Sequence, residues 1–197
     1  GLAAFGLVLV TAVWGVTFVV VKDAVERMPV MDFLAIRFLI AALVMIAIRP
    51  SALAGIGRLG ARHGALLGLA LGIGYIAQTF GLQHTSASVS GFITGMFVVF
   101  TPLIAGLGLR QHVGAPASLG AGGPAVISLK GFAIGPGELL TLVCAICFAV
   151  HIVGLGQWAG QHGAYPLAVA QLLAVSAICL VIGAADVGTT WLAGFDA

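Results

Sequence analysis

Long apolar runs, separated by short polar or charged stretches, dominate the pattern of this chain. Six of them approach the roughly 20 residues that a helix needs to cross a bilayer. They lie at residues 2–21, 31–48, 64–83, 87–109, 137–158 and 164–185. The runs are continuous rather than alternating between apolar and polar, which favours helices over the strands of a membrane barrel. The pattern therefore predicts an all-α, polytopic membrane helix bundle.

Three parts of this pattern differ from a simple membrane-spanning run. Residues 113–129 are apolar but contain prolines and several glycines, and their length is at the low end for a crossing, so whether they span is left open. Pro102 is expected to kink the fourth helix. The stretch after residue 185 is expected to be a tail too short to cross.

Composition agrees with a lipid-exposed chain. Its 197 residues are 61% hydrophobic and 7% charged, with a mean hydropathy of +1.19. Soluble domains carry roughly 25% charged residues, so these few charges could not cover a surface that faces water. The net charge of +2 is small and the basic residues are scattered, which argues against a nucleic-acid partner.

Basic residues in the short loops predict the orientation. The stretch 49–63 contains Arg49, Arg58 and Arg62 and no acid, whereas 22–30 mixes acids and bases. Because Lys and Arg accumulate in cytoplasmic loops, we expect 49–63 in the cytoplasm. The N-terminus is then cytoplasmic as well, in a multi-pass protein of the cell (inner) membrane.

Two parts of the chain resemble each other. AVWGVTFVVVK at 12–22 aligns with AICFAVHIVGL at 145–155, and residues 35–44 align with 169–178 after a one-residue difference in the loop. Such internal similarity indicates a repeat.

In this register Phe18 matches His151, and Arg37 matches Gln171. If 113–129 crosses the membrane, five helices separate the copies and the second copy is inverted. Inverted repeats are typical of secondary transporters, whose substrate site lies at the repeat interface.

The same residues resemble a known family. WGVTF at 14–18, followed by Lys22, is similar to the first-helix pattern of EamA-type transporters in the drug/metabolite transporter superfamily. AIRF at 35–38 resembles the second-helix pattern of that family. Residues 81–106 resemble its third-to-fourth helix passage, and residues 137–153 resemble the start of its second repeat.

The resemblance implies inverted five-helix repeats. Residues 1–130 would form the first repeat, and 136–197 would begin a second repeat that is incomplete. It further implies a secondary transporter, not an enzyme, that exports small metabolites, such as amino acids, related metabolites or drugs, by alternating access. The expected partners are the lipid bilayer and a small-molecule substrate, with a homodimer left open and no nucleic acid.

Polar and aromatic side chains inside the apolar runs are the candidate substrate-binding residues. They are Trp14, Thr17, Arg37, Tyr75, Gln78, His151 and Gln171. Thr11, Trp14 and Thr17 recur at helical spacing, so they could line a cavity or simply pack. The same alternatives apply to the polar stripe around Tyr75 and Gln78.

Arg37 and His151 each have two interpretations. Arg37 could snorkel to the outer interface, where Asp23, Glu26 or Asp32 would neutralise it. Alternatively, it could face the bundle and hold a substrate carboxylate or phosphate. His151 could carry a proton during transport or be a hydrogen-bonded structural residue.

Other functions have weaker support in the sequence. Ser88-Val89-Ser90-Gly91 with His151 resembles the serine–histidine dyad of rhomboid-type proteases, although Ser88 stands where that motif has glycine. A truncated, non-transporting membrane fragment is a further alternative. Cys144 and Cys147 lie in an apolar run without a second ligand pair, so no metal site is expected. There is no nucleotide-binding glycine loop, and no cofactor is expected.

Overall fold

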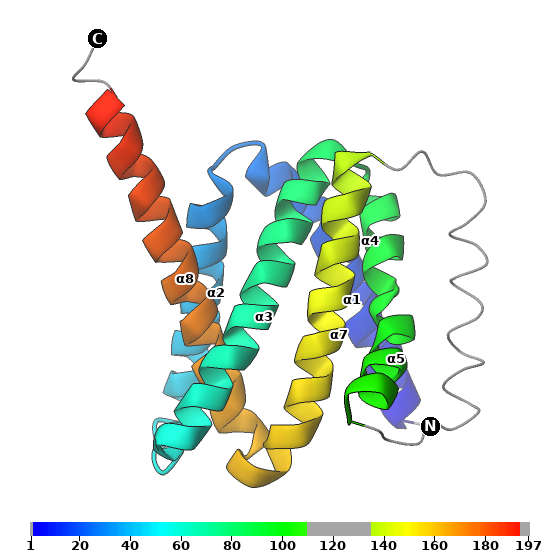
Figure 1. Ribbon diagram of the computed structural model, residues 1–197, viewed down its shortest axis with the longest axis vertical. Coiled ribbons are helices and arrows are strands. Elements are labelled where there is room, and N and C mark those ends of the chain that lie inside the picture. Colours follow the sequence, from blue (N-terminus) through cyan, green and yellow to red (C-terminus); the bar gives the residue numbers. More distant parts are fainter. Residues whose placement is uncertain (1, 110–134, 194–197) are drawn as a thin grey trace. The chain divides into compact units, whose positions relative to one another are not determined.

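The computed structural model describes residues 2–109 and 135–193, and all the regular elements in them are helices (Figure 1). In chain order these are α1 (Leu2–Val25), α2 (Val30–Ile48), α3 (Gly57–His84), α4 (Ala87–Gly95), α5 (Phe97–Leu109), α7 (Pro136–His162) and α8 (Ala164–Ala193). Six segments of the described chain, with α4 and α5 together forming one, are long and apolar enough to cross a membrane. The prediction of a polytopic helical membrane protein is confirmed. The doubtful segment 113–129 lies outside the described residues.

Two helices extend beyond the predicted apolar runs. α3 begins at Gly57 rather than at 64, so Arg58 and Arg62 lie on its first turns and not in a loop. α8 continues to Ala193, through most of the stretch that was expected to be a tail. Apolarity marks the part of a helix that is matched to lipid. The helix itself continues as long as its backbone hydrogen bonds are favourable.

The predicted fourth helix is divided in two. The Met96 N–H donates to the Ile93 carbonyl at 3.0 Å, and the Val99 N–H donates to the Met96 carbonyl at 2.9 Å. Both bonds reach back three residues, which makes a tight turn between α4 and α5. The interruption therefore lies at Met96, whereas Pro102, where a kink was expected, lies inside α5.

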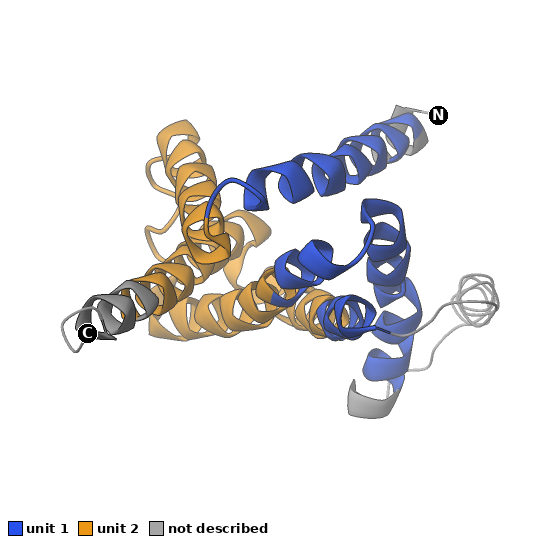
Figure 2. Cartoon of the chain, turned by 90° about the horizontal axis from the view of Figure 1, so that it is seen from above, with its two compact units in different colours: residues 1–28, 77–146 blue, residues 29–76, 147–197 orange. Residues whose placement is uncertain are grey.

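The described chain forms two compact units (Figure 2). Unit 1 contains residues 1–28 and 77–146, and unit 2 contains residues 29–76 and 147–197. Unit 1 thus holds α1, α4, α5, the end of α3 and the first part of α7. Unit 2 holds α2, α8 and the remaining parts of α3 and α7.

Close backbone approach holds α3 and α7 together in unit 1. A Cβ placed on Gly81 would lie 2.9 Å from the Gly137 carbonyl oxygen and 2.8 Å from Thr141 Oγ1. Only glycine permits helices to approach so closely. Phe18 and Leu82 are among the buried apolar side chains of this unit.

In unit 2, α2 packs antiparallel against α8. Tyr165 Oη donates to the Met45 carbonyl at 2.7 Å, near the end of α2. Ser176 Oγ donates to the Ala35 carbonyl at 3.0 Å, near its beginning. As the residue number rises along α8 it falls along α2, so the two helices run in opposite directions.

The glycine stripe of α3 packs on α8 in the same unit. A Cβ on Gly64 would lie 2.5 Å from Ala170 Cβ, and one on Gly68 would lie 2.5 Å from Ala174 Cβ. Glycines four residues apart on α3 thus allow its backbone to approach α8 closely at both positions. At Gly72 the nearest atoms would be 3.7 Å away, an ordinary contact.

Candidate functional site

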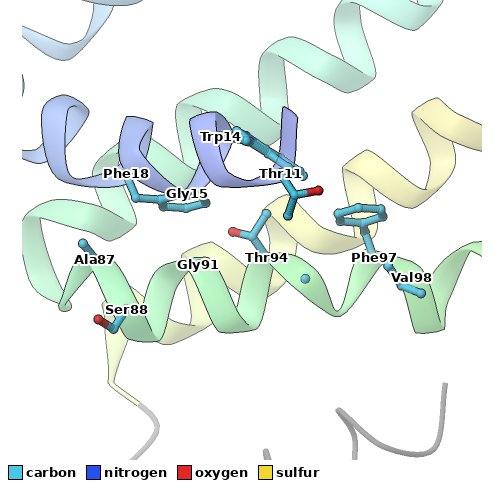
Figure 3. Close-up of a pocket in the computed structure, with 11 residues that line it drawn as sticks. Thr11, Trp14, Gly15, Phe18, Ala87, Ser88, Gly91, Thr94, Phe97 and Val98 are labelled. Carbon is cyan, nitrogen blue, oxygen red and sulfur yellow. The ribbon is translucent and has the colours of Figure 1, made fainter. Parts of the chain in front are cut away.

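A cavity of about 480 Å³ lies in unit 1 between α1 and the α4–α5 pair (Figure 3). Three aromatic rings line it, from Trp14, Phe18 and Phe97. Three hydroxyl-bearing residues line it as well, Thr11, Ser88 and Thr94. The other lining residues are small or apolar: Gly15, Ala87, Gly91, Gly95 and Val98. None of the side chains in this wall is charged.

The aromatic wall comes from two helices. The ring centroids of Trp14 and Phe97 are 5.8 Å apart, and those of Trp14 and Phe18 are 6.4 Å apart. Trp14 and Phe18 are four residues apart, so they share one face of α1. Tilted rings at these distances form a favourable aromatic contact, which fixes the position of the indole.

Glycines on α4 create the space opposite these rings. A Cβ on Gly91 would lie 3.9 Å from the Phe18 ring, and one on Gly95 would meet nothing within 4 Å. Among the described residues, no backbone of another helix lies within 4 Å of a Cβ at either position. The two glycines thus leave volume for a ligand.

The predicted stripe on α1 is only partly in the cavity. Thr11 and Trp14 line it, but Thr17 does not. Thr17 Oγ1 donates to the Trp14 carbonyl at 2.6 Å, within its own helix. A threonine hydroxyl in a helix readily makes this local bond, so Thr17 supports α1 and does not contribute to the cavity wall.

Gln78 does not line the cavity itself but is hydrogen-bonded to a residue that does. Its Nε2 donates to Thr94 Oγ1 at 3.0 Å and to Cys144 Sγ at 3.5 Å. Gln78 and Thr94 are both buried, and Thr94 lines the cavity although Gln78 does not. Gln78 thus orients a hydroxyl of the wall.

Charged residues join three segments at one end of unit 1. Lys22 Nζ donates to the Thr85 carbonyl at 2.6 Å, and Thr85 Oγ1 donates to Glu138 Oε1 at 2.5 Å. Glu138 also accepts from the Gly135 N–H at 2.9 Å, as a capping glutamate does. α1 ends and α7 begins at this point, so these two helices run in opposite directions.

Arg37 and Tyr75 meet in unit 2. Arg37 Cζ lies 5.3 Å from the Tyr75 ring centroid, 5.6 Å from that of Phe38 and 6.0 Å from that of Phe33. In the described part of the chain no acid pairs with Arg37, and Asp23 pairs with Arg27 instead, at 3.1 Å. The guanidinium is therefore held by aromatic rings and not by the acids that the snorkelling interpretation would require.

His151 and Gln171 are joined directly in unit 2. His151 Nε2 lies 2.6 Å from Gln171 Oε1. An amide oxygen only accepts, so Nε2 must carry a proton and donate. The hydrogen bond links α7 to α8, which gives the pair a structural role whether or not the histidine also exchanges protons.

Comparison with known proteins identifies the family. Residues 1–127 match the model of the EamA-like transporter family. The chain belongs to the EamA-like transporter family. A protein of Archaeoglobus fulgidus, named as an uncharacterized transporter, is 33% identical over 178 residues, which are 88% of this chain and 55% of that protein. The chain thus spans about half the length of the curated relative that it matches. No solved structure gives a significant match.

The EamA-like chain also contains a histidine pair that the sequence did not reveal. His63 Nδ1 lies 2.9 Å from His162 Nε2, and the His63 ring stacks on Trp158 with centroids 4.2 Å apart. These histidines stand near the ends of apolar runs. They link α3 to α7. Because the two histidines are far apart in the sequence, the sequence pattern does not reveal their contact.

The serine motif of the EamA-like chain has no hydrolytic arrangement in the described residues. Ser90 is fully buried, and its Oγ lies 3.5 Å from Thr141 Oγ1. Within the described chain no histidine is hydrogen-bonded to Ser88 or Ser90. The same residues include no group of three or more His, Cys, Asp or Glu side chains placed to hold a metal ion.

Proposed function

We propose that the protein is a secondary transporter that exports small metabolites, amino acids or drugs across the cell membrane by alternating access. The observation that carries this proposal is the cavity on α1, α4 and α5. Its volume of about 480 Å³ falls within the roughly 300–1,000 Å³ of small-molecule sites. Its aromatic, uncharged wall suits the apolar part of an organic solute.

The helix directions support alternating access. α1 and α7 run in opposite directions, and α2 and α8 do so as well. These pairs are the first and second helices of the two similar sequence segments. Opposite directions are what an inverted repeat requires, and rocking between inverted halves is the usual basis of alternating access.

The basic residues support the proposed orientation. Arg49, Arg58 and Arg62 lie at the end of α2 and the start of α3, all exposed. By the positive-inside rule, this end is expected in the cytoplasm. The N-terminus of α1 is then cytoplasmic, because two crossings, α1 and α2, lie between it and Arg49.

Filling the cavity tests the transport proposal. Gly95→Leu places a side chain where nothing lies within 4 Å, so the helix should fold normally while the cavity shrinks. We expect at least about a tenfold loss of solute efflux from vesicles that contain the full-length protein, because a filled site loses the contacts that hold the solute.

A matched glycine provides the control. Gly6 on α1 also has nothing within 4 Å and does not line the cavity, so Gly6→Leu should leave efflux unchanged at equal expression. Full activity of Gly95→Leu would remove the cavity from the mechanism. Failure of the unsubstituted protein to move any solute of a broad panel would overturn the transport proposal itself.

A further inference from the structure

The position of Arg37 on α2 raises the question of what its charge serves. α2 runs from Val30 to Ile48, so at about 1.5 Å per residue Arg37 lies roughly 10 Å from the start of the helix. This is close to the middle of the span. A fixed charge at such depth is costly, and it marks a functional position unless a partner neutralises it.

The surroundings of Arg37 stabilise the cation but leave its donors available. The rings of Phe33, Phe38 and Tyr75 lie 5.3–6.0 Å from Cζ, within the range of a cation–π contact. Aromatic rings accept no strong hydrogen bond, whereas a guanidinium has five N–H donors in one plane. In the described part of the chain no oxygen accepts from these donors, and the side chain is only half-buried.

We propose that Arg37 receives the carboxylate of a small solute, with Phe38 and Tyr75 forming the apolar wall beside it. This inference rests on the proposed transport function and names a solute class for it. A carboxylate matches the planar fork of the guanidinium and can accept two parallel hydrogen bonds. A monoanion is neutralised by one guanidinium, while a phosphate dianion would need a second cation.

The depth of Arg37 favours a solute over a lipid headgroup. Headgroups lie at the surface of a hydrocarbon core about 30 Å thick, and Arg37 lies near the middle of its span. Arg49, at the end of the same helix, is the residue that a headgroup would reach. Arg49 also lies over an aromatic ring, with Cζ 5.8 Å from the Tyr165 centroid, which makes it a matched control.

Binding of acids and of their amides tests the inference. The full-length protein is placed in phosphatidylcholine nanodiscs and titrated with benzoate, phenylacetate and amino acids, each beside its uncharged amide. Arg37→Gln should weaken binding of the acids at least about tenfold, since a charge-assisted bidentate contact is lost. It should leave binding of the amides unchanged. Arg49→Gln should leave both unchanged.

Chemical protection provides a second measurement that needs no variant. Phenylglyoxal modifies arginine, and mass spectrometry reads each site. Benzoate should slow the modification of Arg37 at least severalfold and leave that of Arg49 unaffected. Equal protection of both, or acid binding that survives Arg37→Gln, overturns the inference. Loss of acid binding when phosphatidylglycerol is added would also overturn it, because a headgroup would then be the occupant.

These outcomes are separable from those of the transport proposal. If Gly95→Leu abolishes efflux while Arg37→Gln leaves acid binding intact, transport stands and the carboxylate site falls. If benzoate protects Arg37 in a protein that moves no solute of the panel, the site stands and the transport proposal falls.

Discussion

Gln78 is a buried amide whose two donors hold groups on two other helices. It donates to Thr94 Oγ1 at 3.0 Å and to Cys144 Sγ at 3.5 Å. Thr94, with 1% of its surface exposed, has little contact with water that could replace this partner. The hydroxyl that lines the cavity therefore depends on a residue outside the cavity.

Gln78→Leu is expected to destabilise the protein by about 1–3 kcal/mol, because it leaves a buried hydroxyl without its donor. Thermal unfolding in detergent measures the change. Gln83→Leu, at an exposed position of the same helix, is the control and should shift the unfolding temperature little. An equal shift for both variants would mean that the bond to Thr94 has no special importance.

At the scale of residues, the sequence predicted which side chains share a helix face better than it predicted their partners. Helical spacing placed Thr11 and Trp14 on one face, and both line the cavity. It could not show that the Thr17 hydroxyl bonds to its own helix. Nor could it place Phe97 opposite Trp14, because that contact depends on how α1 packs against α5.

The start of α3 shows how small residues set the distance between helices. Its Gly64 and Gly68 lie directly against α8, where a Cβ would come within 2.5 Å of an alanine Cβ. At Gly68 the Cβ would also lie 2.8 Å from the Gln171 carbonyl oxygen, which is backbone and cannot rotate away. The contact between α3 and α8 therefore requires glycine at both positions.

Gly64→Ala and Gly68→Ala should each destabilise unit 2 by about 1–3 kcal/mol, as is usual when an extra methyl overfills a packed contact. Gly72→Ala is the matched control, since its Cβ would meet its nearest neighbours at 3.7 Å. Alanine there should be neutral or should stabilise the helix by up to about 1 kcal/mol. Urea or thermal unfolding in detergent ranks the three, and a Gly72→Ala as damaging as the others would contradict the packing argument.

At the scale of elements, hydropathy located every crossing in the described chain but not every end. It missed the first turns of α3 and the extension of α8 because these parts lie beyond the apolar run. It also missed the break at Met96, where a tight turn separates α4 from α5. Such ends depend on local hydrogen bonds, which an average over apolar residues does not detect.

For the whole molecule, the direction in which each helix runs decides whether the two similar segments are parallel or inverted copies. In unit 1, the link through Thr85 brings the end of α1 to the start of α7. In unit 2, the bonds from Tyr165 and Ser176 set α8 antiparallel to α2. The internal sequence similarity paired these same helices, but it could not decide between parallel and inverted copies, because that depends on an uncertain count of crossings.

The opposed directions predict which loops share a side of the membrane. We expect Ser51 and Gln161 on the cytoplasmic side and Glu26 on the other. α2 separates Glu26 from Ser51, and the bond between His63 and His162 joins the start of α3, which follows Ser51, to the end of α7. All three of the positions to be labelled are exposed. They can therefore be converted one at a time to cysteine in a background without the native thiols.

A membrane-impermeant maleimide added to intact cells should label Glu26→Cys and leave Ser51→Cys and Gln161→Cys unlabelled until the membrane is opened. Labelling of Gln161→Cys together with Glu26→Cys would contradict the antiparallel arrangement of α1 and α7, and with it the inverted repeat. If only the sides are exchanged, with Ser51 and Gln161 both labelled from outside, the arrangement stands and the orientation inferred from the arginines is wrong. The experiment thus separates the direction of the helices, which rests on hydrogen bonds, from the orientation in the membrane, which rests on charge.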